Sequence, residues 1–482
     1  MTRPPFGFGP GDRPEEPSEG DDPFGLSAMF GGAGGPFGGD MGAVFTQMQR
    51  LMSWSGGPVN WDLATEVATG QTRADDRPVT ADEQGAIADA CRLADLWLDP
   101  VTTLPATGAS PQAWSRTGWV ESTLPSWRSL VDPVAGRVVA AMGGALEQGL
   151  AGGLPEGAPP ELAGLLGGLG GGGLGPLKGI MDQVGGFVFG AQVGQALGAL
   201  AGEVLSASEI GLPLSTAGPA ILPANLAAFS EGLEVPASEV LLYVCLRELA
   251  HQRLFASVPW LKAHLFDAVD AYARGIEVDP AAIERAVGSI DPSDPESMQR
   301  AMGEGLFDME PTPAQQAALA RLETALALVE GWVDAVVDAA ASAKLPSAVA
   351  LRETVRRRRA SGGPAEQTFA TLVGLQLRPR RLREAAALWA AIAETGGHEG
   401  RDALWAHPDL LPAADDLDDP AGFVARSAGA ADWDAGLRDL DKDFDGSLDD
   451  DAAGGPAGED GGPAGGDGGA AEDDGGPERD QG

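Results

Sequence analysis

A stretch near the middle of the chain, CLRELAHQRLF from Cys245 to Phe255, carries three side chains whose spacing bears on metal chemistry. In the zinc-binding helix pattern His-Glu-x-x-His, two histidines four residues apart reach one ion, and the glutamate polarises a metal-bound water. Glu248 and His251 stand at the glutamate and second-histidine positions, but Arg247 stands where the first histidine would be. The pattern indicates hydrolytic metal chemistry with one ligand replaced.

A second pair of acidic residues could complete such a site. The segment VEGWVDAVVDAA places Glu330 and Asp334 one helical turn apart. In one class of zinc peptidases a downstream helix supplies a glutamate ligand, and an aspartate one turn further on hydrogen-bonds a ligand histidine from behind. Glu330 is therefore the candidate carboxylate ligand, and Asp334 the candidate support for a histidine.

Longer stretches of the sequence carry a resemblance to a known family. They are LRELAHQRLFASVPWL, LVEGWVDAVVDAA, FATLVGLQLRPRRLREAAALW, GRDALWAHPDLLPAADDLDDP, GPVNWDLA and FGAQVGQALG, spread from about Gly57 to Val424. In these stretches the chain resembles an actinobacterial zincin-like metallopeptidase family. The resemblance implies a zincin-like fold, hydrolase chemistry and zinc as the cofactor. It also implies that Glu248 is the catalytic glutamate and that His251 and Glu330 are zinc ligands.

Arg247 departs from the family pattern, and its chemistry leaves two functional interpretations. A guanidinium is always protonated and has only donors, so it cannot bind Zn²⁺, but it can pair bidentately with a carboxylate. In the first interpretation Arg247 takes the place of the metal, bridging to Glu330 or Glu248, and the scaffold is a non-catalytic binding or structural protein. In the alternative the chain is an active zinc-dependent metallopeptidase, with Glu248 as general base and His251, Glu330 and an unidentified group as ligands. The arginine favours the first interpretation, and whether the chain is an enzyme stays open.

The remaining histidines do not strengthen the metal interpretation. Glu-x-x-His arises on helices by chance, so Glu248 and His251 alone would be weak evidence. His264 could reach round from the next helix, and His398 and His407 could approach from further along the chain. We expect all three to be structural.

The sequence predicts a mainly α protein with a zincin-like helical body. Alanine and leucine dominate, and no segment sustains the alternation of a strand. Helical spacing predicts helices at 237–257, 260–275, 312–342, 346–359 and 379–395, and another from Asp82 onward. Residues 41–430 are expected to form the folded domain, residues 1–40 a disordered Gly/Pro/Phe-rich arm, and residues 431–482 a disordered acidic tail.

Glycine recurs at every fourth position from Gly186 to Gly202 in GGFVFGAQVGQALGALAG, which leaves one helix face almost without side chains. Such a face could belong to a membrane helix with repeated small residues, or to a buried helix that another backbone approaches closely. Gln192 and Gln195 lie midway, and aromatic and basic flanking residues are missing, so we favour the buried helix. No membrane span is expected.

Charge distribution bears on possible partners. The formal net charge of −39 argues against general nucleic-acid affinity. Arginines gather in RETVRRRRASGG and LRPRRLREA, where they could contact phosphate or pair with acidic parts of the same chain. Because aromatic residues are not interleaved with them, we favour intramolecular pairing. An unidentified protein or peptide partner is expected instead.

Two further features concern calcium and cell compartment. The segment DKDFDGSLDDDA resembles a calcium loop, but Ala452 stands where a bidentate glutamate is needed, so tight calcium binding is not expected. Cys91 and Cys245 are too few for a disulfide framework, and the first residues lack the pattern of a secretory signal. The expected compartment is the cytoplasm.

Overall fold

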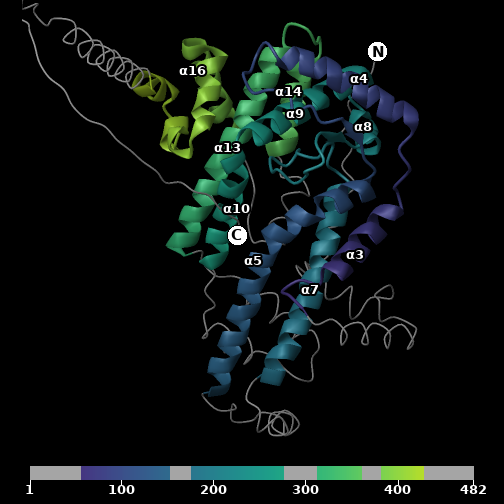
Figure 1. Ribbon diagram of the computed structural model, residues 1–482, viewed down its shortest axis with the longest axis vertical. Coiled ribbons are helices and arrows are strands. Elements are labelled where there is room, and N and C mark those ends of the chain that lie inside the picture. The colour runs from purple at the N-terminus through teal and green to yellow at the C-terminus, as the bar shows by residue number, and fades with distance from the viewer. Residues whose placement is uncertain (1–55, 152–174, 276–311, 361–380, 428–482) are drawn as a thin grey trace, which may run out of the picture. The chain divides into compact units, whose positions relative to one another are not determined.

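The structure is a computed structural model that describes residues 56–151, 175–275, 312–360 and 381–427. Helices make up nearly all of the regular structure of these residues (Figure 1), so the predicted mainly α fold is confirmed. The predicted arm, acidic tail and calcium-like loop lie outside the described residues. The described residues as far as Val424 belong to one compact unit, and the proposed domain boundaries stay predictions.

The described residues contain ten helices, two short strands and three 3-10 turns. The helices are α3 (Trp61–Arg73), α4 (Ala81–Leu98), α5 (Arg116–Ala151), α7 (Gly175–Ala201), α8 (Pro223–Ser230), α9 (Ala237–Ser257), α10 (Pro259–Arg274), α13 (Pro313–Ala341), α14 (Ala348–Ala360) and α16 (Leu382–Ala403). Two short strands are β1 (Gln112–Ala113) and β2 (Ala220–Ile221), and three single 3-10 turns, η1 (Leu404–Ala406), η2 (Pro408–Leu410) and η3 (Asp415–Leu417), follow α16.

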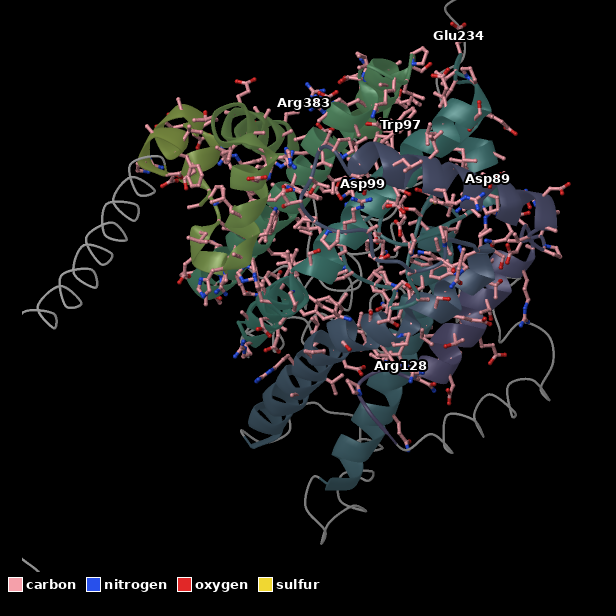
Figure 2. The ribbon with its side chains drawn as sticks, turned by 45° about the horizontal axis from the view of Figure 1, so that its top comes forward. Asp89, Trp97, Asp99, Arg128, Glu234 and Arg383 are labelled. Carbon is pink, nitrogen blue, oxygen red and sulfur yellow. The ribbon has the colours of Figure 1, made fainter. Side chains whose placement is uncertain are left out.

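Helix α9 lies at the centre of the core. Its side chains from Leu242 to Leu254 are all buried, which is typical of a helix covered on every side. Helices α4, α8, α10, α13 and α14 all contact it. At its C-terminal end Arg253 Nη2 lies 2.7 Å from carboxylate oxygens of both Asp95 and Asp99 (Asp99 is labelled in Figure 2), which fixes α9 against α4.

Helix α13 begins at a well-defined cap and is held in place from the far side. Thr312 and Gln315 form a capping box, with Pro313 at the first helical position. Helix α16 approaches so closely that a Cβ on Gly331 would lie 2.6 Å from the Cβ of Ala385. Because α13 is fixed at its start and along one face, its rotation about its own axis is fixed. The side chains that it presents to α9 are therefore fixed as well.

The glycine-rich face of α7 is covered by α3, which lies beside it in Figure 1. A Cβ on Gly190 would lie 2.6 Å from the carbonyl oxygen of Asn60, and a Cβ on Gly194 would lie 2.6 Å from that of Ala64. The two backbones can approach this closely only because α7 has no side chains at these positions. The expected buried helix is therefore the correct interpretation, and no helix among the described residues is long and apolar enough to cross a membrane.

A small parallel sheet ties the loop between α7 and α8 to the segment before α5. Gln112 pairs with Ala220 and Ala113 with Ile221. The Trp114 amide donates to the Ile221 carbonyl oxygen at 2.9 Å. The pairing helps to fix the irregular loop of residues 202–222. This loop covers the candidate site.

Candidate functional site

Two helices that are distant in sequence bring the candidate residues together. Arg247 and His251 are one turn apart on α9 and face α13, where they meet Glu330. Arg247 Nη2 donates to Glu330 Oε2 at 2.7 Å, and His251 Nε2 lies 3.2 Å from Glu330 Oε1. Arg247 thus pairs with Glu330 and not with Glu248. A second arginine reaches the same carboxylate from α14, since Arg359 Nη2 lies 2.8 Å from Oε1.

Glu330 is fully buried and ionised. Burial alone would favour the neutral acid, but the charges of Arg359, His251 and Arg247, together with the bond from His251, outweigh it and hold the pKa of Glu330 well below its usual range. The carboxylate is therefore a permanent anion shared by several cations. A metal ion would have to compete with them for its oxygens.

The ring of His251 faces an acceptor at each nitrogen. Nδ1 lies 2.9 Å from the carbonyl oxygen of Arg247, and Nε2 faces the Glu330 carboxylate. Because both oxygens can only accept, the tautomer of the ring decides which of the two contacts is a hydrogen bond. The two oxygens hold the ring in a fixed orientation between α9 and α13.

Glu248 points away from Glu330 and into the loop between α7 and α8. The Ser208 amide donates to Oε2 at 2.9 Å, and Gln252 Nε2 donates to Oε1 at 2.9 Å. Longer contacts of 3.4 Å come from the Ser208 hydroxyl and the Ala220 amide. Burial raises the pKa of Glu248 even though hydrogen bonds from Ser206, Gln252 and Ser208 oppose the shift. Its carboxylate holds the loop and the second strand in place.

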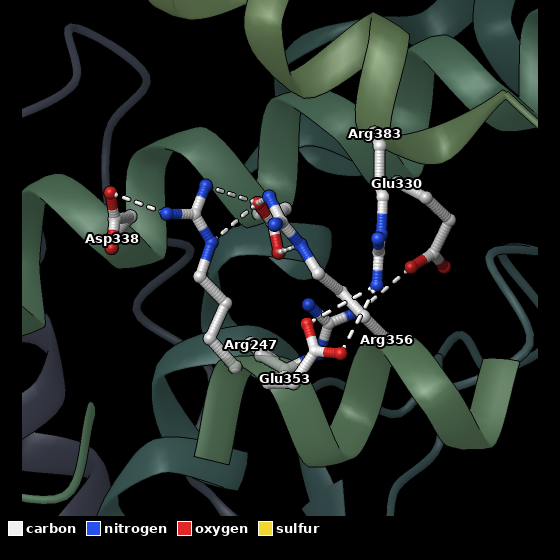
Figure 3. Close-up of polar contacts among 8 residues, drawn as sticks. Arg247, Glu330, Asp338, Glu353, Arg356 and Arg383 are labelled. Carbon is white, nitrogen blue, oxygen red and sulfur yellow. Dashed lines mark hydrogen bonds and ion pairs between the residues drawn. The ribbon is translucent and has the colours of Figure 1, made fainter. Parts of the chain in front are cut away.

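Asp334 lies one turn beyond Glu330 but does not support His251. Arg352 and Arg356 of α14 donate to its two oxygens at distances of 2.6–3.1 Å. The group behind His251 is the backbone carbonyl of Arg247. Figure 3 shows how the arginine and carboxylate side chains of these helices interleave.

Gly211 closes the pocket from the loop side. Its φ of +79° is a left-handed conformation, and a Cβ there would lie 2.8 Å from Glu330 Oε1. The loop can therefore cover the carboxylate only with glycine at this position. With Glu248 and Glu330 at 0% exposure and His251 at 1%, the pocket is sealed from solvent.

The three remaining histidines have ordinary surroundings. His264 packs edge-on against Trp260, with ring centroids 5.7 Å apart, and burial lowers its pKa. His407 accepts a bond from the Asp409 amide at 3.2 Å, and His398 is exposed. None of these described contacts involves the pocket.

The sequence analysis missed several residues that shape the pocket. Gln252 follows Glu248 by one helical turn, so its contact with that carboxylate could have been foreseen from helical spacing. Ser208 and Gly211 lie in an irregular loop, and no sequence signal pointed to their position. The arginine runs were expected to pair within the chain, and this is confirmed for Arg352, Arg356, Arg357, Arg358, Arg359, Arg381 and Arg383. Arg378 and Arg380 lie outside the described residues.

This fold and this helix pair define the class of the protein. Residues 59–424 match the family model for zincin-like metallopeptidases, and the chain belongs to that family. A solved structure from Chloroflexus aurantiacus, described as "a putative hydrolase with a novel fold", is similar, with a TM-score of 0.50 and 18% sequence identity. The match covers 76% of this chain and 98% of that one. A search of curated proteins found no match.

The family implies zinc, but the residues of this pocket do not fit the ion. Among the described residues no group of three or more His, Cys, Asp or Glu side chains is placed to hold a metal. The position of the first histidine carries a guanidinium, which has no lone pair to donate and would repel the cation. The oxygens of Glu330 are already bound by Arg247 and Arg359, and His251 lies beside them.

Proposed function

We propose that this family member is a non-catalytic scaffold or binding protein in which Arg247 replaces the metal. The observation that supports this most directly is the 2.7 Å bond between Arg247 Nη2 and Glu330 Oε2. A zinc peptidase helix would offer an imidazole at this position, with a lone pair directed at the ion. Here a fixed positive charge is bound to the acid that would otherwise be a ligand.

The surroundings of Glu248 support the same proposal. A general base must reach a water or substrate proton. The Glu248 carboxylate is instead surrounded by donors from Ser208, Ala220 and Gln252 and is closed off from solvent. In this role Glu248 stabilises the loop over the pocket, and His251 and Glu330 form part of an ion-pair cluster.

The test is the metal content of the purified full-length chain after incubation with Zn²⁺ and removal of excess ion. We expect no stoichiometric zinc in the wild-type protein. We expect Arg247→His to gain zinc binding, because it restores an imidazole lone pair one turn before His251. A matched control is Arg253→His, which places an imidazole elsewhere on the same helix. One tightly bound zinc per wild-type chain that is lost on His251→Ala would overturn the proposal.

The alternative is an active zinc-dependent metallopeptidase or hydrolase. One observation favours it: His251 Nε2 and Glu330 Oε1 converge to 3.2 Å, as two ligands of one ion would. In that case Glu248 would be the general base, and His251 and Glu330 ligands with a further ligand elsewhere. Chelator-sensitive peptide hydrolysis by the wild-type chain that Glu248→Gln abolishes would establish this activity.

We also propose a cytoplasmic location and a protein or peptide partner. Cys91 and Cys245 are both free thiols buried in the core, which suits a reducing compartment. Fractionation of the native host cell tests the location.

A further inference from the structure

The face of α13 that α14 covers carries an acidic row, which consists of Glu330, Asp334 and Asp338. Helix α14 faces it with an arginine row, which consists of Arg352, Arg356 and Arg359. Arg359 lies 2.8 Å from Glu330, Arg356 lies 2.6 Å from Asp334, and Arg352 lies 2.6 Å from Asp334 and 2.7 Å from Asp338. The rows run in opposite directions along the chain, and each has roughly one charge per helical turn.

The arginine row lies outside Glu330 and Asp334, while Asp338 at the end of the acidic row is 36% exposed. The side chains of Arg352, Arg356 and Arg359 are 24%, 19% and 13% exposed, whereas those of Glu330 and Asp334 are 0% and 1% exposed. Helix α14 therefore covers buried carboxylates of α13. If it moved away, Asp334 and Asp338 would be open to water and to other cations, and Glu330 would lose its cover on the α14 side.

The cover is held by charge more than by apolar packing. Among the described residues of α14, the buried apolar side chains are Ala348, Leu351 and Val355, while Val349 is 73% exposed. Buried ion pairs contribute little net stability, because each charge gives up its hydration when the pair forms. On release both rows regain water, so the exchange of one basic helix for another has a small free-energy cost.

We propose that the acidic row is a binding surface for a basic helix of a partner protein, and that α14 is its intramolecular occupant. The partner helix would carry arginines spaced as in the arginine row, with intervals of four and three residues. Arginine suits this surface because its fork can bind one carboxylate through two bonds, as Arg352 and Arg356 each do at Asp334. The inference rests on the proposed binding role and names the class of partner.

Amide hydrogen exchange of the wild-type full-length chain tests whether α14 can detach. Raising salt from ~0.05 M to ~1 M shortens the screening length several-fold, so we expect amides of α14 to exchange at least ~tenfold faster. Amides of α10, which packs through apolar side chains, are the internal control and should change less than ~twofold. Exchange in α14 that is slow and independent of salt would overturn the proposal.

A peptide with the sequence 348–360 tests the surface itself. Labelled peptide should bind the R356Q/R359Q chain at least ~tenfold more tightly than the wild-type chain, whose own α14 competes at high effective concentration. The control chain R357Q should behave like wild type, since Arg357 is 76% exposed and pairs with Glu353 of its own helix. A control peptide of identical composition, with its arginines moved to other positions, should bind weakly. Equal binding of both peptides would overturn the proposal.

The two proposals can fail separately. Glu330 belongs both to the pocket and to the acidic row, but the readouts differ: zinc content of the wild-type and Arg247→His chains reports on metal binding, while amide exchange and peptide binding report on release of α14. If the R356Q/R359Q chain does not fold, the salt dependence of exchange in the wild-type chain still decides the question.

Discussion

Glu330 is the side chain on which the buried cluster depends. Arg247 approaches it from α9, Arg359 from α14, and His251 completes the group. Loss of one cation leaves the acid neutralised by the others, but loss of the acid leaves neighbouring positive charges in a buried place. The anion is therefore more sensitive to substitution than any one of its partners.

We predict that Glu330→Gln lowers the free energy of unfolding by about 3–5 kcal/mol, because buried charges are then left unpaired. Urea unfolding of the full-length chain at pH 7 measures the change. The control Asp338→Asn removes a carboxylate that is 36% exposed and should cost less than about 1 kcal/mol. Similar losses for the two variants would contradict this view of Glu330.

The pH dependence of that difference follows from the lowered pKa. An unfolded glutamate ionises near its ordinary value of 4.5, while the folded group stays charged to lower pH. Ionised Glu330 therefore stabilises the fold above pH 4.5, and this contribution is lost as the pH falls through the folded pKa. The gap between wild type and Glu330→Gln should be widest near neutral pH and should narrow in acid. Glu248 acts in the opposite sense, because its raised pKa gives stability below its ordinary value that is lost as pH rises.

At the level of helices, the packing of α7 on α3 depends on the absence of side chains. We predict that Gly194→Ala destabilises the protein by about 1–3 kcal/mol, because its Cβ would overlap the Ala64 carbonyl oxygen and Val67. Gly70 on α3 is the matched control, since a Cβ there meets nothing within 4 Å. Gly70→Ala should raise stability by about 0.5–1 kcal/mol through helix propensity. Thermal unfolding of the two variants decides between these outcomes.

Local sequence patterns predicted some helices closely and others poorly. The predicted helix at 237–257 matches α9, and that at 312–342 differs from α13 by one residue at each end. The prediction at 379–395 ended before the pair Gly396 and Gly397. In the structure Gly397 has a positive φ, but the helix resumes beyond this kink as far as Ala403. Helix α5 was not predicted because it contains Pro125 and Pro133, which usually end a helix.

The candidate site was predictable only in part, for a related physical reason. Motif spacing identified Arg247, His251 and Glu330, because helical periodicity places residues on a known face. Arg359 and Gly211 reach the same carboxylate from a separate helix and an irregular loop. Such contacts depend on tertiary packing, which one sequence does not reveal.

Over the whole molecule, the positive charges are largely used within the chain. The arginines of the two basic runs that the structure describes bind acidic groups or backbone oxygens of the same protein. Because their charge is paired within the chain and the net charge is −39, we expect little attraction for a polyanion.

We predict that the full-length chain does not bind duplex DNA or single-stranded RNA, even at ~50 mM salt, where such binding is strongest. Fluorescence anisotropy with labelled oligonucleotides measures this directly, and a basic DNA-binding protein serves as the positive control. Saturable binding that weakens steeply with salt would contradict this prediction.

The cation beside Glu330 is covalently part of the polypeptide, and this affects how the protein matures. A protein that depends on a bound ion is only as stable as the supply of that ion allows, since stabilisation grows with the ion's free concentration. On our proposal that Arg247 replaces the metal, the pocket needs no metal ion to be inserted after synthesis. Starving the cell of trace elements, or adding EDTA to the purified chain, should leave its melting temperature where it was.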